Sequence, residues 1–206
     1  MVGNDVVDLA DRDSWPETRH ARFDERVFAP GERRRLCEAP DADSLRWILW
    51  AAKESAYKAA RQWRPDTVFS PSRFEVHLDR EGRGQVHHDR DRYAVLVERR
   101  VDCIHAVCTG PGAAGEPPLV GVERLGEPGR DGRRPAEPGQ AARRLALEQI
   151  AARLGVPDDS LRLGRRQRVP RVWHRDGRPA GWLSLSHHGR YVAFAHRAPA
   201  GSQGLP

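Results

Sequence analysis

Two helical patterns dominate the distribution of hydrophobic and polar positions along the chain. Residues 44–62 carry the strongest one, because apolar side chains recur there every three or four positions. This apolar stripe consists of Leu45, Ile48, Leu49, Ala52, Ala56 and Ala59. A second amphipathic helix is predicted over residues 140–154, and the Gly155 and Pro157 that follow are expected to end it. Residues 19–36 are also predicted to be helical, with a break at Pro30-Gly31.

Short apolar or alternating runs predict strands in two series. The first series is 2–9, 73–78, 85–88, 93–98 and 103–109, with a turn at Gly82 and Gly84. The second series is 161–163, 169–173 and 182–195. Each series adjoins one strong helix. We therefore expect an α+β fold of two pseudo-symmetric halves, each a helix packed on a small antiparallel sheet.

The segment between the two series, residues 110–139, is dense in Gly, Pro, Arg and Glu. Its few large apolar residues are Leu119, Val120, Val122 and Leu125. This composition predicts a loosely packed linker. We accordingly divide the chain into a first half (1–109), a linker (110–139), a second half (140–199) and a short tail (200–206).

Composition narrows the functional classes. The net charge of +6, from 35 basic and 29 acidic residues, favours an acidic partner. Basic residues are interleaved with acids rather than striped with aromatics, which argues against a nucleic-acid-binding protein. The three cysteines lack metal-ligand spacing, and we find neither a signal peptide nor a membrane-length apolar run. We expect a reduced, cytoplasmic protein that binds no membrane.

Lysine is almost absent from the chain. Lys53 and Lys58 are the only lysines among 35 basic residues, and both lie in the run Lys53-Glu54-Ser55-Ala56-Tyr57-Lys58. Because every other basic residue is arginine, lysine at these two positions suggests a site that needs a compact ammonium rather than a planar guanidinium. On a helix Glu54 and Lys58 face the same way, an arrangement that suits a metal ion beside a phosphate. An ordinary ion pair on the helix surface is the alternative.

Two other segments carry candidate chemistry. In the strand Gly3-Asn4-Asp5-Val6-Val7-Asp8-Leu9, alternation sends Asp5 and Val7 to one face and Asp8 to the other. A buried acid needs a partner or a metal, although Asp8 at the strand end could instead cap the next helix. Residues 183–195 form two apolar runs around Ser186-His187-His188-Gly189, a turn that suits a phosphate. A plain turn or a His-His metal site are the alternatives, and the segment has no acid or cysteine to complete the metal site.

Together these segments resemble the motifs of the 4′-phosphopantetheinyl transferase superfamily. Residues 3–9 resemble its Gly-x-Asp-x-x-Glu/Asp strand, and residues 22–32 resemble its Arg-Phe stretch that ends in Phe-Thr-x-x-Glu. Residues 50–59 closely resemble its Trp-x-x-Lys-Glu-Ala/Ser-x-x-Lys helix, and residues 184–191 its Ser-His-Ser-Gly elbow. The surfactin-synthetase-activating type has the Ser-His half first. The chain thus resembles that two-half type with its halves in permuted order.

The resemblance implies an activity and the residues that perform it. A transferase of this family moves the 4′-phosphopantetheine arm of coenzyme A to a serine of an apo acyl- or peptidyl-carrier protein and releases 3′,5′-ADP. By this resemblance Asp5 and Glu54 hold Mg²⁺, or Mn²⁺, while Glu54 takes the serine proton and Lys58 contacts the phosphates. The residues implied to bind coenzyme A are Lys58, Arg143, Ser186 and His187.

The chain departs from the family pattern at two places. Val7 stands where the surfactin type has a second acid, so we expect two protein carboxylates on the metal. The Gly-Lys-Pro element appears as Arg168-Val169-Pro170, and Arg168 or Arg166 is a candidate for the missing lysine.

One chain supplies both walls of the expected site, so we expect a monomer with the site between its halves. The carrier should be acidic, given the basic net charge. A catalytically inactive relative that binds coenzyme A or a carrier is the alternative. The intact Asp5, Glu54 and Lys58 argue against it.

Overall fold

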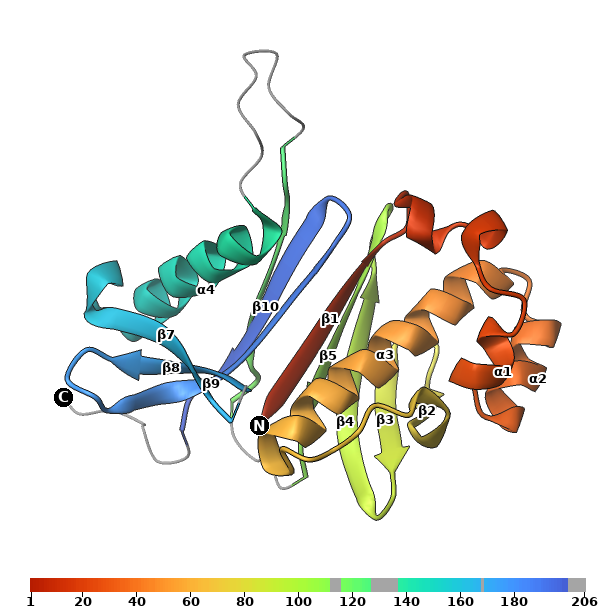
Figure 1. Ribbon diagram of the computed structural model, residues 1–206, viewed down its shortest axis with the longest axis horizontal. Helices are drawn as coiled ribbons and strands as arrows, with labels where there is room; N and C mark the ends of the chain where they lie inside the picture. The colour runs from red at the N-terminus through yellow and green to blue at the C-terminus, as the bar shows by residue number, and fades with distance from the viewer. Residues whose placement is uncertain (112–115, 127–136, 168, 200–206) are drawn as a thin grey trace.

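Two five-stranded antiparallel sheets, each covered by one long helix, make up the described part of the molecule (Figure 1). The computed structural model describes residues 1–111, 116–126, 137–167 and 169–199. The strand order is β1-β5-β4-β3-β2 in the first sheet and β6-β10-β9-β8-β7 in the second. The α+β architecture of two helix-on-sheet halves is confirmed.

The elements follow the predicted order closely. The first half contains β1 (Val2–Asp8), the short turns η1 (Arg12–Ser14) and η2 (Pro16–Thr18), α1 (Phe23–Val27), α2 (Pro30–Glu38), α3 (Ala42–Trp63), η3 (Pro71–Arg73), β2 (Glu75–Leu78), β3 (Arg83–His88), β4 (Asp91–Arg99) and β5 (Cys103–Thr109). The second half contains β6 (Leu119–Arg124), α4 (Pro138–Leu154), η4 (Asp158–Ser160), β7 (Leu161–Arg166), β8 (Val169–His174), β9 (Pro179–His188) and β10 (Tyr191–Arg197). The break predicted at Pro30-Gly31 in the helical segment 19–36 is confirmed, since α1 ends at Val27 and Pro30 begins α2 as its first residue.

Helix α3 packs directly on β1. The carboxylate of Asp41 caps its N-terminus by accepting a hydrogen bond from the Ser44 backbone N–H (2.9 Å). The approach of the two elements is so close that a Cβ on Gly3 would lie 2.6 Å from the backbone nitrogen of Ala59. Only glycine fits at this point of β1, and this fixes the distance between the strand and the helix.

The prediction of a loose linker is wrong for residues 119–124, which form β6 and pair with β10. Leu119 and Leu125 pack on the core beneath α4, whereas Val122 packs on the opposite side with Val6 and Tyr191. A few correctly spaced apolar residues therefore suffice for an edge strand in an otherwise polar segment. The second half begins at β6 rather than at residue 140. Residues 112–115, 127–136 and 200–206 of the predicted linker and tail lie outside the described residues.

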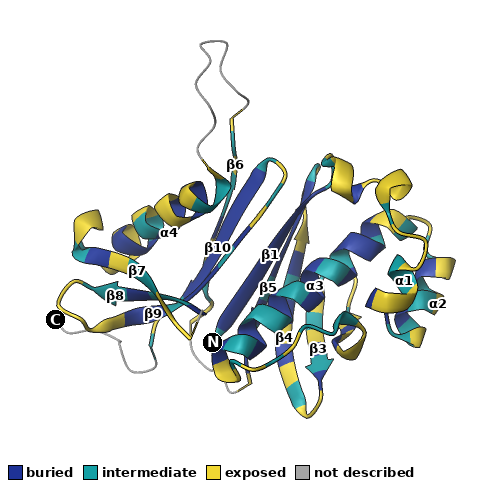
Figure 2. Ribbon diagram, in the orientation of Figure 1, coloured by how far each residue is buried: buried dark blue, intermediate teal, exposed yellow. Residues whose placement is uncertain are grey.

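Strand β1 joins the two halves. It pairs with β5 in the first sheet and lies against β9 and β10 of the second (Figure 1). Figure 2 shows β1 and β10 as two of the most completely buried strands. The side chain of Gln62 on α3 adds a bridge, since it accepts from Val2 N (2.9 Å) and donates to the carbonyl of Leu183 (3.0 Å).

Candidate functional site

The structure brings Asp5, Glu54 and Lys58 together where β1 meets α3. The ammonium of Lys58 donates to Asp5 Oδ1 (2.7 Å) and lies 4.0 Å from Glu54 Oε2. All three side chains remain partly open to solvent, at 12 % exposed for Asp5, 20 % for Glu54 and 28 % for Lys58. As predicted, Asp5 and Asp8 point to opposite faces of β1.

Glu54 has an acidity well outside its ordinary range. Burial raises the pKa of Glu54 to about 7, the nearby charge of Asp5 adds to that increase, and Lys58 partly opposes it. A carboxyl with a pKa near neutrality can both hold and release a proton at physiological pH. It is therefore suited to accept a proton from a hydroxyl.

The same geometry fits a hard cation. Two carboxylates converge on one ammonium, and the mutual repulsion of Asp5 and Glu54 would be relieved by a divalent ion. Val7, the departure from the surfactin-type pattern, faces the core of the first half instead. Asp5 and Glu54 are thus the two protein carboxylates that this site offers.

Lys53, in contrast, takes no part in this constellation. Its ammonium is fully buried on another side of α3 and donates to Glu32 Oε2 (2.7 Å), to the Pro71 carbonyl (3.1 Å) and to the Phe74 carbonyl. Glu32 Oε1 accepts from Val76 N (2.8 Å). The Lys53–Glu32 pair therefore ties α2, α3 and β2 together. Burial lowers the pKa of Lys53, and Glu32 counteracts this effect.

Ser186 and His187 follow each other on β9 and serve opposite faces of the second sheet. Ser186 is buried and faces β1, where its Oγ accepts a hydrogen bond from Asn4 Nδ2 (2.9 Å). Ser184 Oγ accepts from the backbone N–H of Asn4 (2.9 Å). His187 pairs in register with Val192, a residue of the core beneath α4.

His187 on β9 and Arg143 at the beginning of α4 both lie in the neighbourhood of Glu137. Both lie close enough to the Glu137 carboxylate for their charges to lower its pKa, after the larger effect of the hydrogen bond from Gly139 N. Both side chains are exposed, and Arg143 Nη1 donates to the Gly139 carbonyl (3.2 Å). The positive end of the α4 dipole adds to the attraction for an anion here.

The predicted residues thus form two groups: Asp5, Glu54 and Lys58 at α3, and Arg143 and His187 at α4. Ser186 lies between them on the joint with β1. Arg166 is exposed at the end of β7, where its charge lies near Arg171. Arg168 lies outside the described residues.

Asn4 and His105, to which the motifs assign no role, extend this joint. Asn4 is completely buried, and its Nδ2 lies 3.3 Å from Nε2 of His105 on β5. Burial lowers the pKa of His105 to about 4, so the ring is neutral and Nε2 can accept this hydrogen bond. The signal in the sequence was a polar residue between Gly3 and Asp5 in an otherwise apolar strand.

Asp8, whose role the sequence leaves open, is paired with Arg190. Its carboxylate accepts two side-chain hydrogen bonds from Arg190, from Nε (2.8 Å) and from Nη2 (2.7 Å), and a third from the Arg190 backbone N–H (2.9 Å). It also accepts from Ala10 N (3.0 Å), as expected for an acid that caps the next turn. Burial alone would raise the pKa of Asp8, but these hydrogen bonds outweigh burial and lower it to about 2.

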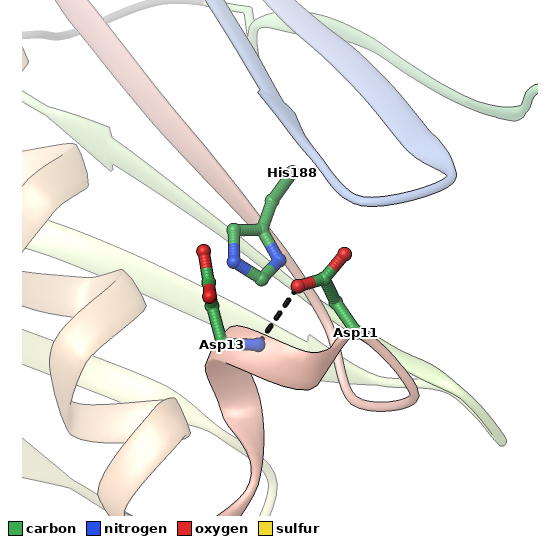
Figure 3. Close-up of side chains that lie close together, drawn as sticks. All are labelled: Asp11, Asp13 and His188. Atoms are coloured by element: carbon green, nitrogen blue, oxygen red, sulfur yellow. Dashed lines mark hydrogen bonds between the residues drawn. The ribbon is translucent and has the colours of Figure 1, made fainter. Parts of the chain in front are cut away.

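A second acidic cluster consists of Asp11, Asp13 and His188 (Figure 3). Ligand atoms of Asp11, Asp13 and His188 lie within 4.8 Å of one another, so η1 and the residue before it supply the acids that the histidine segment lacks. However, His188 Nδ1 accepts a hydrogen bond from Asp8 N (3.1 Å). The neutral ring then carries its proton on Nε2, which makes that nitrogen a donor and not a metal ligand. Asp5 and Glu54 fit a metal better.

Comparison with known proteins identifies a family for the first half of the chain. The profile of the 4′-phosphopantetheinyl transferase superfamily matches residues 1–108, more than half of the 206 residues. This range contains Asp5, Glu54 and Lys58. No curated protein and no solved structure matches the chain. No helix in the described ranges is long and apolar enough to cross a membrane. The chain belongs to the 4′-phosphopantetheinyl transferase superfamily.

Proposed function

We propose that this transferase moves the 4′-phosphopantetheine arm of coenzyme A to a serine hydroxyl of an apo carrier protein and releases 3′,5′-ADP. The observation that carries the proposal is the constellation of Asp5, Glu54 and Lys58 within the segment that matches the family. The carrier is an acyl- or peptidyl-carrier protein with an acidic surface, which complements the net charge of +6.

The residues of the first half perform the chemical step. The serine oxygen forms a bond to the phosphorus that carries the pantetheine arm, and the bond from this phosphorus to the bridging oxygen breaks. Glu54, with a pKa of about 7, accepts the serine proton. Lys58 neutralises phosphate charge as a point cation. Asp5 keeps the ammonium of Lys58 in place through its 2.7 Å contact.

Asp5 and Glu54 are also the residues that would hold Mg²⁺ or Mn²⁺. When bound, the ion would supply further neutralisation of the pyrophosphate charge. Two carboxylates that share one ammonium are a reasonable donor set for such an ion.

The residues of the second half bind the nucleotide end. His187 and Arg143, exposed beside the N-terminus of α4, contact the 3′-phosphate of coenzyme A. The bound phosphate displaces Glu137 from their neighbourhood, since like charges repel. Ser186 contributes through its hydrogen bond with Asn4, which joins the phosphate-binding strand to the strand that carries Asp5.

The test is incubation of the protein with coenzyme A, Mg²⁺ and a panel of apo acyl- and peptidyl-carrier proteins, followed by mass spectrometry of each carrier. We expect one phosphopantetheine added to at least one carrier, together with equimolar 3′,5′-ADP. Glu54→Gln serves as the matched control and should abolish both products. Coenzyme A binding without any mass gain would contradict the proposed transfer and support an inactive relative.

A further inference from the structure

The tip of the β9–β10 hairpin is inserted into a polar collar made by the first half. Asp8 of β1, Asp11 directly before η1 and Asp102 between β4 and β5 lie against His188, Gly189 and Arg190 of the second half. A Cβ on Gly189 would lie 2.6 Å from Asp8 Oδ2 and 2.8 Å from Asp11 Oδ2, and the glycine has a φ of +52°. The approach of hairpin and collar is therefore as close as a backbone permits.

The contact at the centre of this collar is the pair Asp8–Arg190. Asp8 has a side chain that is 1 % exposed and receives three hydrogen bonds from Arg190, two of them from the planar guanidinium. A bidentate pair fixes orientation as well as distance. Arg190 Nη2 also lies 3.5 Å from Asp102 Oδ2, and Tyr191 Oη donates to Asp102 Oδ1 (2.5 Å).

The collar holds one face of the hairpin. It thereby also fixes the position of the side chains on the opposite face. Ser186, His188 and Arg190 all contact β1, through Asn4 Nδ2, Asp8 N and the Asp8 carboxylate respectively. His187 is the residue between two of these anchors and is directed to the opposite face of the sheet, the one that α4 covers, where Glu137 is influenced by the charges of both His187 and Arg143. Any loosening of the anchors changes the position of His187 relative to Asp5 and Glu54.

We propose that Asp8 and Arg190 are positioning residues, which hold the phosphate-binding hairpin in register with the carboxylates of β1 and α3 so that a ligand is recognised by its 3′-phosphate. The inference rests on the proposed function, because it takes coenzyme A as the substrate. Neither residue contacts the reacting atoms. Their effect is exerted through His187.

The experiment compares the binding of coenzyme A and dephospho-coenzyme A, which lacks the 3′-phosphate, by calorimetry. In the wild type we expect coenzyme A to bind more tightly. Arg190→Gln and Asp8→Asn should each reduce this preference on the order of tenfold or more, as expected when a binding group is displaced by about 1 Å. Binding of dephospho-coenzyme A itself should change little. A general loss of stability, in contrast, would weaken the binding of both ligands equally.

The matched control is Arg46→Gln. Arg46 forms a pair of the same kind with Asp24, from Nε to Oδ1 (2.8 Å) and from Nη2 to Oδ2 (2.9 Å), but both residues belong to the first half. This variant should lose stability and keep the wild-type preference. The double variant Asp8→Asn/Arg190→Gln removes both charges and leaves no unpaired buried carboxylate, so it provides a folded protein if a single variant does not fold.

The outcomes separate the two hypotheses. An unchanged preference in Arg190→Gln or in the double variant would overturn the positioning role. A wild type that binds both ligands equally would also overturn it, while carrier modification in the mass assay would still support the transferase. A wild type that binds neither ligand would contradict the proposed function itself. Restoration of the preference in Arg190→Lys relative to Arg190→Gln would support the role of a charged pair.

Discussion

At the scale of single residues, Lys53 and Lys58 show how one helix gives the same residue type two different roles. Lys58 lies between Asp5 and Glu54 and is partly exposed, whereas Lys53 is completely buried against Glu32. We predict that Lys58→Arg loses most transfer activity with little change in melting temperature, because the planar guanidinium cannot replace the compact ammonium between two carboxylates.

Lys53→Arg is the matched control for this prediction. The larger head group must enter a fully occupied pocket, so we expect destabilisation by about 1–3 kcal/mol and near-normal activity of the folded fraction. Thermal unfolding and initial rates of carrier modification distinguish the two variants. Wild-type rates in Lys58→Arg would show that the shape of the cation at this position is irrelevant.

The carboxylates give the second prediction at this scale. Asp5→Asn and Glu54→Gln should each weaken Mn²⁺ binding, measured by electron paramagnetic resonance, and reduce the rate at least ~100-fold. Asp13→Asn in the neighbouring acidic cluster should leave both quantities unchanged, because His188 presents a donor there. Full activity after treatment with EDTA would contradict a metal at Asp5 and Glu54.

Single residues also show where sequence reasoning ends. The strand alternation correctly separated Asp5 from Asp8, because side-chain direction in a strand is a local property. The same rule separates Ser186 from His187, yet the motif suggested one shared ligand for them. The partner of Asp8 was not predictable, because Arg190 lies 182 positions away in the chain. Contacts of that kind depend on how the two halves pack.

At the scale of elements, the joint between β1, β5 and β9 contains a neutral buried histidine. His105 has a pKa of about 4, below its ordinary 6.5, because of burial. The unfolded chain therefore binds a proton between these pH values and the folded protein does not. Stability is fully present above pH 6.5 and decreases as the pH falls towards 4, by about 3 kcal/mol for this group.

The variant His105→Gln tests this prediction, since glutamine can accept from Asn4 without titrating. Urea unfolding at pH 7 and at pH 4.5 should show a smaller acid-induced loss of stability in the variant than in the wild type. An equal loss in both proteins would mean that His105 is not the group that titrates.

The elements themselves were largely predictable from periodicity. Helix α3 and strand β4 have the long or alternating patterns that burial of one face produces, whereas β1 and β10 are short apolar runs buried on both faces. Strand β6 was not predicted, because an edge strand has only one neighbouring strand and needs few apolar residues. Its pairing with β10 depends on tertiary packing. The Gly and Pro residues on either side of β6 are typical of a loop and therefore hide the strand pattern.

At the scale of the whole molecule, the described residues of the first half pack against the second half of the same chain. Val6 packs with Tyr191 and Ala193, and Asn4 and Asp8 bond to β9 and to the hairpin tip. The face of β1 that carries Asn4, Val6 and Asp8 is therefore covered by the second half of the same chain. We predict a monomer that binds one coenzyme A per chain, with each site built from the two halves of one chain.

A complementation experiment tests this prediction more directly than mass alone. Glu54→Gln inactivates the first half of the site, and a His187→Ala/Arg143→Ala double variant inactivates the second. If each site belongs to one chain, a mixture of the two variants, refolded together, stays as inactive as either variant alone. If sites form between chains, as in an oligomer, about a quarter of the sites in an equal mixture would receive both intact walls by random pairing, and their activity would return. Light scattering on the wild type and calorimetric stoichiometry for coenzyme A complete the test. Recovered activity in the mixture, or one coenzyme A per pair of chains, would show that the active site is assembled between subunits.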